Sequence, residues 1–284
     1  MTPPKTPVVP PVAPIAIALT IAGSDSSGGA GIQADLKTFA AFAVYGASVI
    51  TALTAQNTIG VQAVSAVAPD FVAAQLASVL DDLAVGAVKT GMLANTGIIQ
   101  AVAAALAKRP DIPLVVDPVM VATSGDPLLQ PDAVDAFKAI LFPRAALITP
   151  NLPEAARLLG APVAKSEAEA RDQLVALGRL GAGAVLLKGG HGGSDEAVDL
   201  LLIGGEIRRF ASPRIDTRNT HGTGCTLSAA IAALLAQGIG LEMAVERAKA
   251  YVHHAIEAGR HLGVGHGHGP VDHLYAIRAG KPPA

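Results

Sequence analysis

The chain has 284 residues, a length that suits one large α/β domain, and one domain is our expectation. Lys and Arg total 21, Asp and Glu total 23, and neither sign forms a long run, so the sequence lacks the basic stripe of nucleic-acid-binding proteins and favours a small-molecule partner. The single cysteine, Cys225, cannot form an internal disulfide, which fits a reducing compartment, and we expect a cytoplasmic protein.

The N-terminal segment is rich in proline. Residues 1–14 contain six prolines and one charge, a composition too interrupted for the apolar core of a signal peptide. We predict a disordered leader over 1–14, followed by a single domain over 15–284.

Short apolar runs bounded by turn residues recur along the chain and are typical of buried strands. They cover residues 15–22, 47–55, 61–67, 84–89, 113–117, 145–149 and 184–188. Segments with helical spacing lie between them, at 71–83, 96–106 and 166–180. This alternation predicts an α/β fold with a central, mostly parallel sheet flanked by helices.

The pattern changes near residue 197. Two further strands are predicted at 197–203 and 206–211, joined by Gly204-Gly205, a dipeptide typical of a tight hairpin, so we expect an antiparallel edge to the sheet. Helices are predicted over 222–237 and 242–262, and no linker indicates a second domain.

The segment from Thr38 to Ala55 has 18 residues and no charge, a length that a membrane span would need. A buried helix joined by a turn at Gly46 to a buried strand has the same composition, because parallel strands are apolar on both faces. We predict the helix and strand, and no membrane role.

A glycine-rich loop, residues 23–31, follows the first predicted strand and opens a helix. It lacks the Gly-Lys-Ser/Thr ending of a P-loop. Residues 29–34 satisfy a relaxed dinucleotide fingerprint, but the next strand has no acidic residue for a ribose hydroxyl. Two interpretations remain: a backbone-lined ligand site at the end of a strand, which four glycines favour, or a tight turn without a ligand.

A second glycine motif, residues 219–226, precedes the helix predicted from 222. The amides of Gly222, Thr223 and Gly224 at a helix N-terminus can converge on an oxyanion and stabilise a transferring phosphoryl group. Cys225 lies in the same turn, where the helix dipole can lower a thiol pKa toward neutrality, so the thiol is a candidate base. The alternatives are a merely capped helix and an inert buried cysteine.

Polar residues also follow other predicted strands. Asn151 and Glu154 lie one helical turn apart and offer oxygen ligands that suit Mg²⁺, although helix capping explains the same pair. Asp117 and Lys188 each end an apolar strand. Either could be an ion-paired core residue, but several polar groups at one sheet edge favour a functional site.

Four histidines gather near the C-terminus, His261, His266, His268 and His273. Their spacing matches no zinc signature. We expect a glycine-rich loop near a nucleotide, or plain surface exposure.

Five motifs in order resemble those of hydroxymethylpyrimidine/phosphomethylpyrimidine kinases. They cover residues 19–25, 28–35, 89–93, 151–154 and 221–225, and the resemblance extends over about residues 15–275. It implies a ribokinase-like fold, use of ATP and Mg²⁺, two successive phosphorylations of a hydroxymethylpyrimidine in thiamine biosynthesis, and a homodimer.

The resemblance also implies roles for individual residues. Gln56 would recognise the aminopyrimidine, since a carboxamide offers a donor and an acceptor side by side. The other expected contacts are Gly23, Asp35 and Met92 around the pyrimidine, Asp117, Asn151, Glu154 and Lys188 at the phosphates and metal, and Cys225 beside the attacking hydroxyl.

Two rival functions remain open. Pyridoxal kinases are similar enough that shared motifs separate them weakly, although Gln56 followed by Asn57 favours a pyrimidine. A non-catalytic sensor of nucleotide or vitamin precursor is the rival from another class, and the presence of Cys225, Lys188 and Glu154 argues against it.

Overall fold

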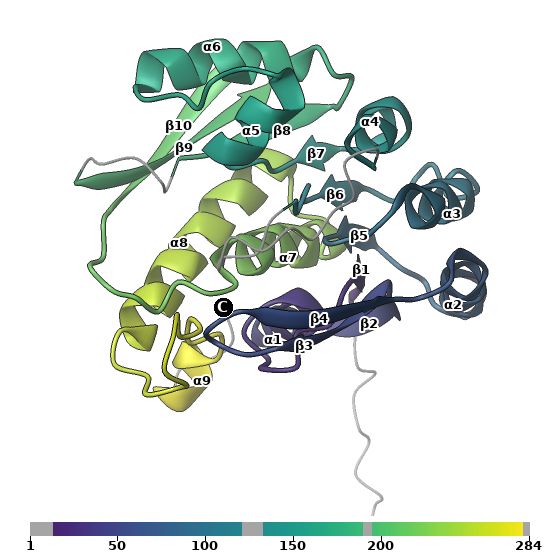
Figure 1. The fold of residues 1–284 in the computed structure, drawn as a ribbon, viewed down its shortest axis with the longest axis horizontal. Helices are drawn as coiled ribbons and strands as arrows, with labels where there is room; N and C mark the ends of the chain where they lie inside the picture. The colour runs from purple at the N-terminus through teal and green to yellow at the C-terminus, as the bar shows by residue number, and fades with distance from the viewer. Residues whose placement is uncertain (1–13, 121–132, 190–194, 281–284) are drawn as a thin grey trace, which may run out of the picture.

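The computed structural model describes residues 14–120, 133–189 and 195–280, which build a sheet covered on both faces by helices (Figure 1). The proline-rich leader predicted over 1–14 lies outside these residues except for its last position.

Eight of the described strands form one sheet in the order β10-β9-β8-β7-β6-β5-β1-β2. Their bounds are β1 Ile17–Ala22, β2 Tyr45–Ile50, β5 Ala87–Thr90, β6 Leu114–Val116, β7 Leu147–Ile148, β8 Ala184–Lys188, β9 Glu196–Ile203 and β10 Glu206–Pro213. Neighbours from β2 through β8 are parallel, whereas β9 runs antiparallel to both β8 and β10. The prediction of a mostly parallel sheet with an antiparallel edge hairpin is confirmed.

Helices cover the two faces of the sheet, as Figure 1 shows. One face carries α2 Pro69–Asp82, α3 Thr96–Leu106, α4 Ala133–Ala136 with the short turns Phe137–Leu141 and Phe142–Arg144, α5 Leu152–Leu159 and α6 Glu167–Gly178. The other carries α1 Gly31–Ala41, α7 Thr223–Ala236 and α8 Leu241–Gly259, with α9 Tyr275–Arg278 beside α8. Each face encloses its own apolar core.

Helix α7 is the most enclosed helix on its face. Every residue from Thr226 to Leu234 is buried, because the helix packs on β1, β5 and β6 and lies between α1 and α8. Full burial of a side chain such as Ile231 contributes roughly 1.5–3 kcal/mol relative to exposure. This packing fixes the position of the first turn of α7, which carries the second glycine motif.

The strand predicted at 47–55 is two strands that belong to different sheets. After β2 the chain bends at the buried Thr51, whose hydroxyl donates to the carbonyl of Met92 (2.6 Å). Strand β3, Ala52–Gln56, then pairs antiparallel with β4, Val61–Ala66, in a separate two-stranded sheet. The prediction that the strand at 61–67 is buried is wrong, because β4 is almost wholly exposed.

The turn expected at Gly46 falls three residues earlier. Ala43 takes the left-handed backbone conformation (φ 54°), and Gly46 lies inside β2. A Cβ added at Gly46 would lie 2.8 Å from Leu36 Cδ2 and 2.9 Å from Phe39 Cδ2, so this glycine permits close packing of α1 on the strand. Within the described residues, no helix is long and apolar enough to cross a membrane.

Candidate active site

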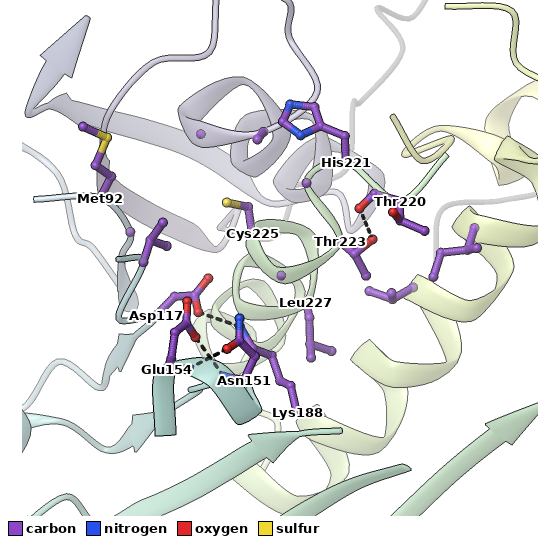
Figure 2. Close-up of a pocket in the computed structure, with 18 of the residues that line it drawn as sticks. Met92, Asp117, Asn151, Glu154, Lys188, Thr220, His221, Thr223, Cys225 and Leu227 are labelled. Carbon is purple, nitrogen blue, oxygen red and sulfur yellow. Dashed lines mark hydrogen bonds and ion pairs between the residues drawn. The ribbon is translucent and has the colours of Figure 1, made fainter. Parts of the chain in front are cut away.

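A cavity of about 670 Å³ lies beyond the carboxyl ends of the parallel strands and in front of α7. Parallel α/β sheets bind ligands at this edge, and the volume falls in the range of small-molecule sites. The predicted site residues that line it are Gly23, Gln56, Met92, Asp117, Asn151, Glu154, Lys188, Gly222, Thr223, Gly224 and Cys225. Figure 2 shows several of these side chains pointing toward one another around Cys225.

Asp35 does not line this cavity, which corrects its expected place around the pyrimidine. The residue is fully buried, and its carboxylate accepts hydrogen bonds from Lys89 Nζ (2.9 and 2.8 Å) and from the Thr20 hydroxyl (2.6 Å). Motif matching missed this, because the position of Asp35 on the inner side of α1 turns its side chain toward the sheet rather than the ligand.

Lys89 lines the cavity in place of Asp35, and the sequence interpretation gave it no role. Burial by itself disfavours the ammonium, yet the Asp35 carboxylate raises the pKa of Lys89 above its usual value. A lysine at the end of a buried apolar strand, as in residues 84–89, was a signal that could have identified it.

Asp117 and Lys188 form an ion pair at the centre of the cavity wall. Lys188 Nζ lies 2.8 Å from Asp117 Oδ1, and the hydroxyls of Thr149 (3.0 Å) and Ser228 (3.3 Å) also donate to this carboxylate. Although burial opposes ionisation, Lys188, Lys89 and the Thr149 hydroxyl lower the pKa of Asp117 below its usual value. Asp117 follows β6 and Lys188 ends β8, so both lie at the carboxyl edge of the sheet, as the sequence predicted.

Asn151 and Glu154 form a capping box at the start of α5. The Asn151 side chain accepts from the Glu154 amide, and the Glu154 carboxylate accepts from the Asn151 amide, both at 2.8 Å. Helix capping therefore accounts for the pair, and both residues still face the cavity. Burial raises the pKa of Glu154 to about 7, with Lys188 opposing and Asp117 reinforcing the shift.

These oxygen atoms are compatible with Mg²⁺. The ion binds proteins through one or two carboxylates and takes its other ligands from water and phosphate. Asp117 and Glu154 supply two carboxylates on one wall of the cavity. No group of three or more His, Cys, Asp or Glu among the described residues could hold a metal by itself.

The first turn of α7 faces the same ion pair. Gly222 has φ 79°, and a Cβ there would collide with the carbonyl oxygen of Gly29, so only glycine fits. A Cβ added at Gly224 would lie 3.2 Å from Lys188 Nζ, which shows how closely the helix N-terminus approaches the ammonium. The first amides of a helix have no intrahelical acceptor and carry partial positive charge. The N-terminus of α7 and the Lys188 ammonium therefore both direct positive charge toward the cavity.

The expected lowering of the Cys225 thiol pKa is wrong. Burial raises the pKa of Cys225 to about 11; the nearby Lys89 opposes this shift, while Asp35 and Asp117 reinforce it. Burial and the two carboxylates together outweigh the effect of Lys89, and only the tertiary structure reveals those neighbours.

The amides of the first glycine-rich loop bind an internal anion. The Asp25 carboxylate accepts from the amides of Ser27 (2.9 Å), Gly29 (3.0 Å) and Ala30 (2.8 Å) and contacts His221 Nε2 (2.8 Å). The loop lines the cavity, but the amides of Ser27, Gly29 and Ala30 already donate to the Asp25 carboxylate. Asp25 thereby joins the two glycine motifs, a connection between residues 196 positions apart that no local pattern shows.

Gln56 stands at the end of β3, where the small sheet meets the cavity. Its backbone is anchored to the Ser26 hydroxyl, which accepts from the Gln56 amide and donates to the Gln56 carbonyl, both at 2.8 Å. The Thr54 hydroxyl donates to Gln56 Oε1 (3.2 Å). The backbone anchors and the Thr54 contact orient the carboxamide.

The C-terminal histidines do not line the cavity. His273 is buried, with Nε2 3.0 Å from the Thr226 hydroxyl, and burial lowers its pKa to about 4. His266 and His268 lie in a loop that contacts the turn between β3 and β4. Of the two expectations, plain surface exposure fits His261, His266 and His268, whereas His273 is buried.

A family model described as phosphomethylpyrimidine kinase matches residues 25–272. The chain belongs to the phosphomethylpyrimidine kinase family. A hydroxymethylpyrimidine/phosphomethylpyrimidine kinase of Rhizobium meliloti (strain 1021) is 58% identical over 260 residues, which cover 92% of this chain and 97% of the relative.

Solved structures agree with this membership. A Bacillus subtilis pyridoxal kinase, determined as an ADP complex, is 39% identical with a TM-score of 0.85 and covers 93% of this chain and 99% of that chain. A Clostridium difficile 630 phosphomethylpyrimidine kinase is 43% identical with a TM-score of 0.74 and covers 84% and 99% of the two chains. Because pyridoxal kinases have the ribokinase-like fold, the predicted fold class of this family member is confirmed.

Proposed function

We propose that the protein transfers phosphoryl groups from ATP to 4-amino-5-hydroxymethyl-2-methylpyrimidine and then to its monophosphate, in thiamine biosynthesis. Family membership supports the pyrimidine kinase reaction. The observation that carries the proposal is the Asp117–Lys188 pair facing the N-terminus of α7 across one cavity, because phosphoryl transfer depends mainly on positioning and on stabilising spread negative charge.

Lys188 and the amides of Gly222, Thr223 and Gly224 would stabilise the transferring phosphoryl group. Such fixed donors act without reorganising during the reaction. Asp117 and Glu154 would hold Mg²⁺, with Asn151 keeping Glu154 in place through the capping box. When bound, Mg²⁺ supplies neutralisation of phosphate charge.

The nucleotide base would lie at the far end of the cavity, between β10 and α8. Pro213, Val252 and Ile256 give this end an apolar wall. An aromatic purine can pack there, while its phosphates reach Lys188 and the start of α7. Sequence interpretation missed this region, because its residues come from two elements that share no local pattern.

At the opposite end, Gln56 would recognise the aminopyrimidine edge. Gly23 and Met92 would form the adjoining wall: a Cβ added at Gly23 would lie 3.1 Å from Met92 Sδ, so a larger residue would narrow the slot for a planar ring. Cys225 would lie beside the hydroxymethyl group, and its thiolate, the minor form near neutral pH, would take the hydroxyl proton as the bond to phosphorus forms. The loose transition state of phosphoryl transfer depends more on positioning and charge stabilisation than on strong proton abstraction.

The deciding experiment measures ADP release with Mg²⁺-ATP and three acceptors at equal concentration: the hydroxymethylpyrimidine, its monophosphate and pyridoxal. Turnover of both pyrimidines supports the proposal. Preference for pyridoxal would replace it with the pyridoxal kinase function, and no turnover with any acceptor would favour a non-catalytic sensor.

Two variants test the residue roles. We expect Gln56→Ala to weaken pyrimidine affinity in calorimetry while leaving ATP affinity unchanged; equal loss of both would refute its role in recognition. Cys225→Ala is expected to bind both ligands and turn over slowly, and an unchanged rate would remove the thiol from the mechanism.

Pyridoxal phosphorylation is the second candidate. The similarity to a pyridoxal kinase with a TM-score of 0.85 favours it, since a shared fold and cavity can accept either ring. The carboxamide of Gln56 favours the pyrimidine, because a pyridine lacks the adjacent ring nitrogen and exocyclic amine that a carboxamide can pair with.

We also propose a homodimer in the cytoplasm. Isolated two-stranded sheets are marginally stable in water, and the β3–β4 sheet exposes Leu53 (53%) and Val64 (44%). A second copy would cover these side chains. Light scattering of the purified protein decides the oligomeric state: a monomer at micromolar concentration would refute the dimer.

A further inference from the structure

The hairpin that carries Gln56 is held at its turn by a glycine-rich loop, residues 263–269. Thr58 stands at this turn, two residues after Gln56. Its hydroxyl accepts hydrogen bonds from the backbone amides of His266 (3.2 Å) and Gly267 (3.1 Å), and its carbonyl accepts one from the amide of His268 (2.8 Å). Three backbone donors of one loop thus converge on a single residue of the hairpin.

The same loop is tied to the segment that precedes α7. The His221 amide donates to the carbonyl of Gly269 (3.0 Å), and His268 Nδ1 lies 3.3 Å from the carbonyl of Arg218. The Asn219 side chain donates to the carbonyls of Gly259 (2.7 Å) and Leu262 (3.1 Å), which fixes the start of the loop. The loop therefore bridges the small sheet and the second glycine motif.

Two glycines of the loop are required by their contact with the hairpin. A Cβ added at Gly267 would collide with the carbonyl oxygen of Thr58 and lie 2.9 Å from the Cα of Ile59. Gly265 has φ 72°, and a Cβ there would lie 2.9 Å from Thr58 Cβ. Gly263, in the same loop, has nothing within 4 Å of an added Cβ. Gly265 and Gly267 therefore have no room for a side chain against Thr58, whereas Gly263 does.

The position of Gln56 depends on attachments on both sides of it. Ser26 holds its own backbone, and Thr58 holds the turn that follows. Within the turn, the Asn57 side chain accepts from the amides of Ile59 (2.9 Å) and Gly60 (3.2 Å), which links the residues of the turn to one another. Loss of the Thr58 contacts would leave Gln56 anchored on one side only.

We propose that the loop 263–269 positions the hairpin that recognises the pyrimidine, and that Thr58 and Gly267 are positioning residues for acceptor binding. The loop acts through its backbone amides, so the side chain of His266 has no part in it. This proposal rests on the proposed function, since it takes Gln56 to be the pyrimidine-recognising residue.

Steady-state kinetics of matched variants test the proposal. We expect Gly267→Ala and Thr58→Val to raise the KM for the hydroxymethylpyrimidine about tenfold, the scale of one or two lost hydrogen bonds. The KM for ATP and kcat at saturating pyrimidine should stay at the wild-type values. Gly263→Ala and His266→Ala should match the wild type, and Thr58→Ser, which keeps the hydroxyl, should restore the KM.

Two results would overturn the positioning role: a wild-type pyrimidine KM in both Gly267→Ala and Thr58→Val, or a common shift of both KM values and kcat accompanied by a lower Tm. The Gln56→Ala variant separates this failure from failure of the proposed function. If Gln56→Ala raises the pyrimidine KM and Gly267→Ala does not, only the loop's role fails. If the wild type neither binds nor phosphorylates the pyrimidine, both fail.

Discussion

Replacing Lys89 by methionine isolates the buried ion pair beneath the cavity. Methionine preserves the volume and flexibility of the lysine side chain and removes its charge. Lys89 and Asp35 are both fully buried, and two contacts of 2.8 and 2.9 Å join the ammonium to the carboxylate. In the variant, Asp35 keeps the Thr20 hydroxyl as its side-chain donor among the contacts described above.

Removing one partner of a buried ion pair costs about 3–5 kcal/mol, because the other charge stays buried without compensation. A folded domain has a total stability of about 5–15 kcal/mol. Lys89→Met should therefore lose a large part of the free energy of unfolding. Asp35→Asn combined with Lys89→Met should lose less than Lys89→Met alone, because no uncompensated charge remains.

Urea denaturation of the wild type, both single variants and the double variant measures these differences as a double-mutant cycle. Burial raises the pKa of Asp35 against the opposing effect of Lys89, and without the lysine this pKa should rise further. A carboxyl whose folded pKa exceeds its unfolded value of about 3.9 loses stability as pH rises between the two values. The stability deficit of Lys89→Met relative to the wild type should accordingly grow as the pH rises above the unfolded value of about 3.9.

Either of two outcomes would refute this reasoning. The first is a Lys89→Met variant within about 1 kcal/mol of the wild type, well below the cost of an uncompensated buried charge. The second is a double variant whose loss equals the sum of the two single losses, which would show that Lys89 and Asp35 act independently.

Three further predictions follow from the other ionisable groups. Because burial raises the pKa of Cys225 to about 11, the thiolate fraction grows as the pH rises, and kcat should rise between pH 7 and 9 in the wild type. In Cys225→Ala kcat should stay flat over this range. Parallel pH profiles of the two proteins would contradict a role for the thiol as base. Burial raises the pKa of Glu154 to about 7. Mg²⁺ binding should therefore release a proton at pH 6 and almost none at pH 8, which calorimetry in buffers of different ionisation enthalpy measures. Glu154→Gln should release no proton at either pH. Although burial opposes it, hydrogen bonds from His221, Ser27 and Ala30 hold the pKa of Asp25 well below its usual range. Asp25→Asn should thus be less stable than the wild type at pH 7, and urea titrations should show this difference narrowing as pH falls below the unfolded value of about 3.9; a deficit independent of pH would refute the assignment.

Patterns within a few residues were enough to predict the elements of the main sheet. The apolar run at 184–188 became β8, and Gly204-Gly205 joined β9 to β10 as expected. The convergence of Asp117, Lys188 and the 222–225 motif was also predictable, because parallel strands place their carboxyl ends at one edge.

The small sheet was beyond such patterns. The runs at 47–55 and 61–67 are apolar enough for buried strands, and their composition does not say whether a helix will cover them. The bend at Thr51 depends on a hydrogen bond to Met92, 41 residues away, so the separation of β3 from the main sheet is decided by tertiary contacts.

The sequence by itself determined the order of strands and helices and which residue types reach the active edge, because periodicity and turn chemistry are local. Only the tertiary structure decided that Lys89 faces the cavity while Asp35 lies behind it, and that the pKa of the Cys225 thiol is raised rather than lowered. Both results depend on burial and on charges contributed by distant segments. Such electrostatic properties arise only when the chain has folded around them.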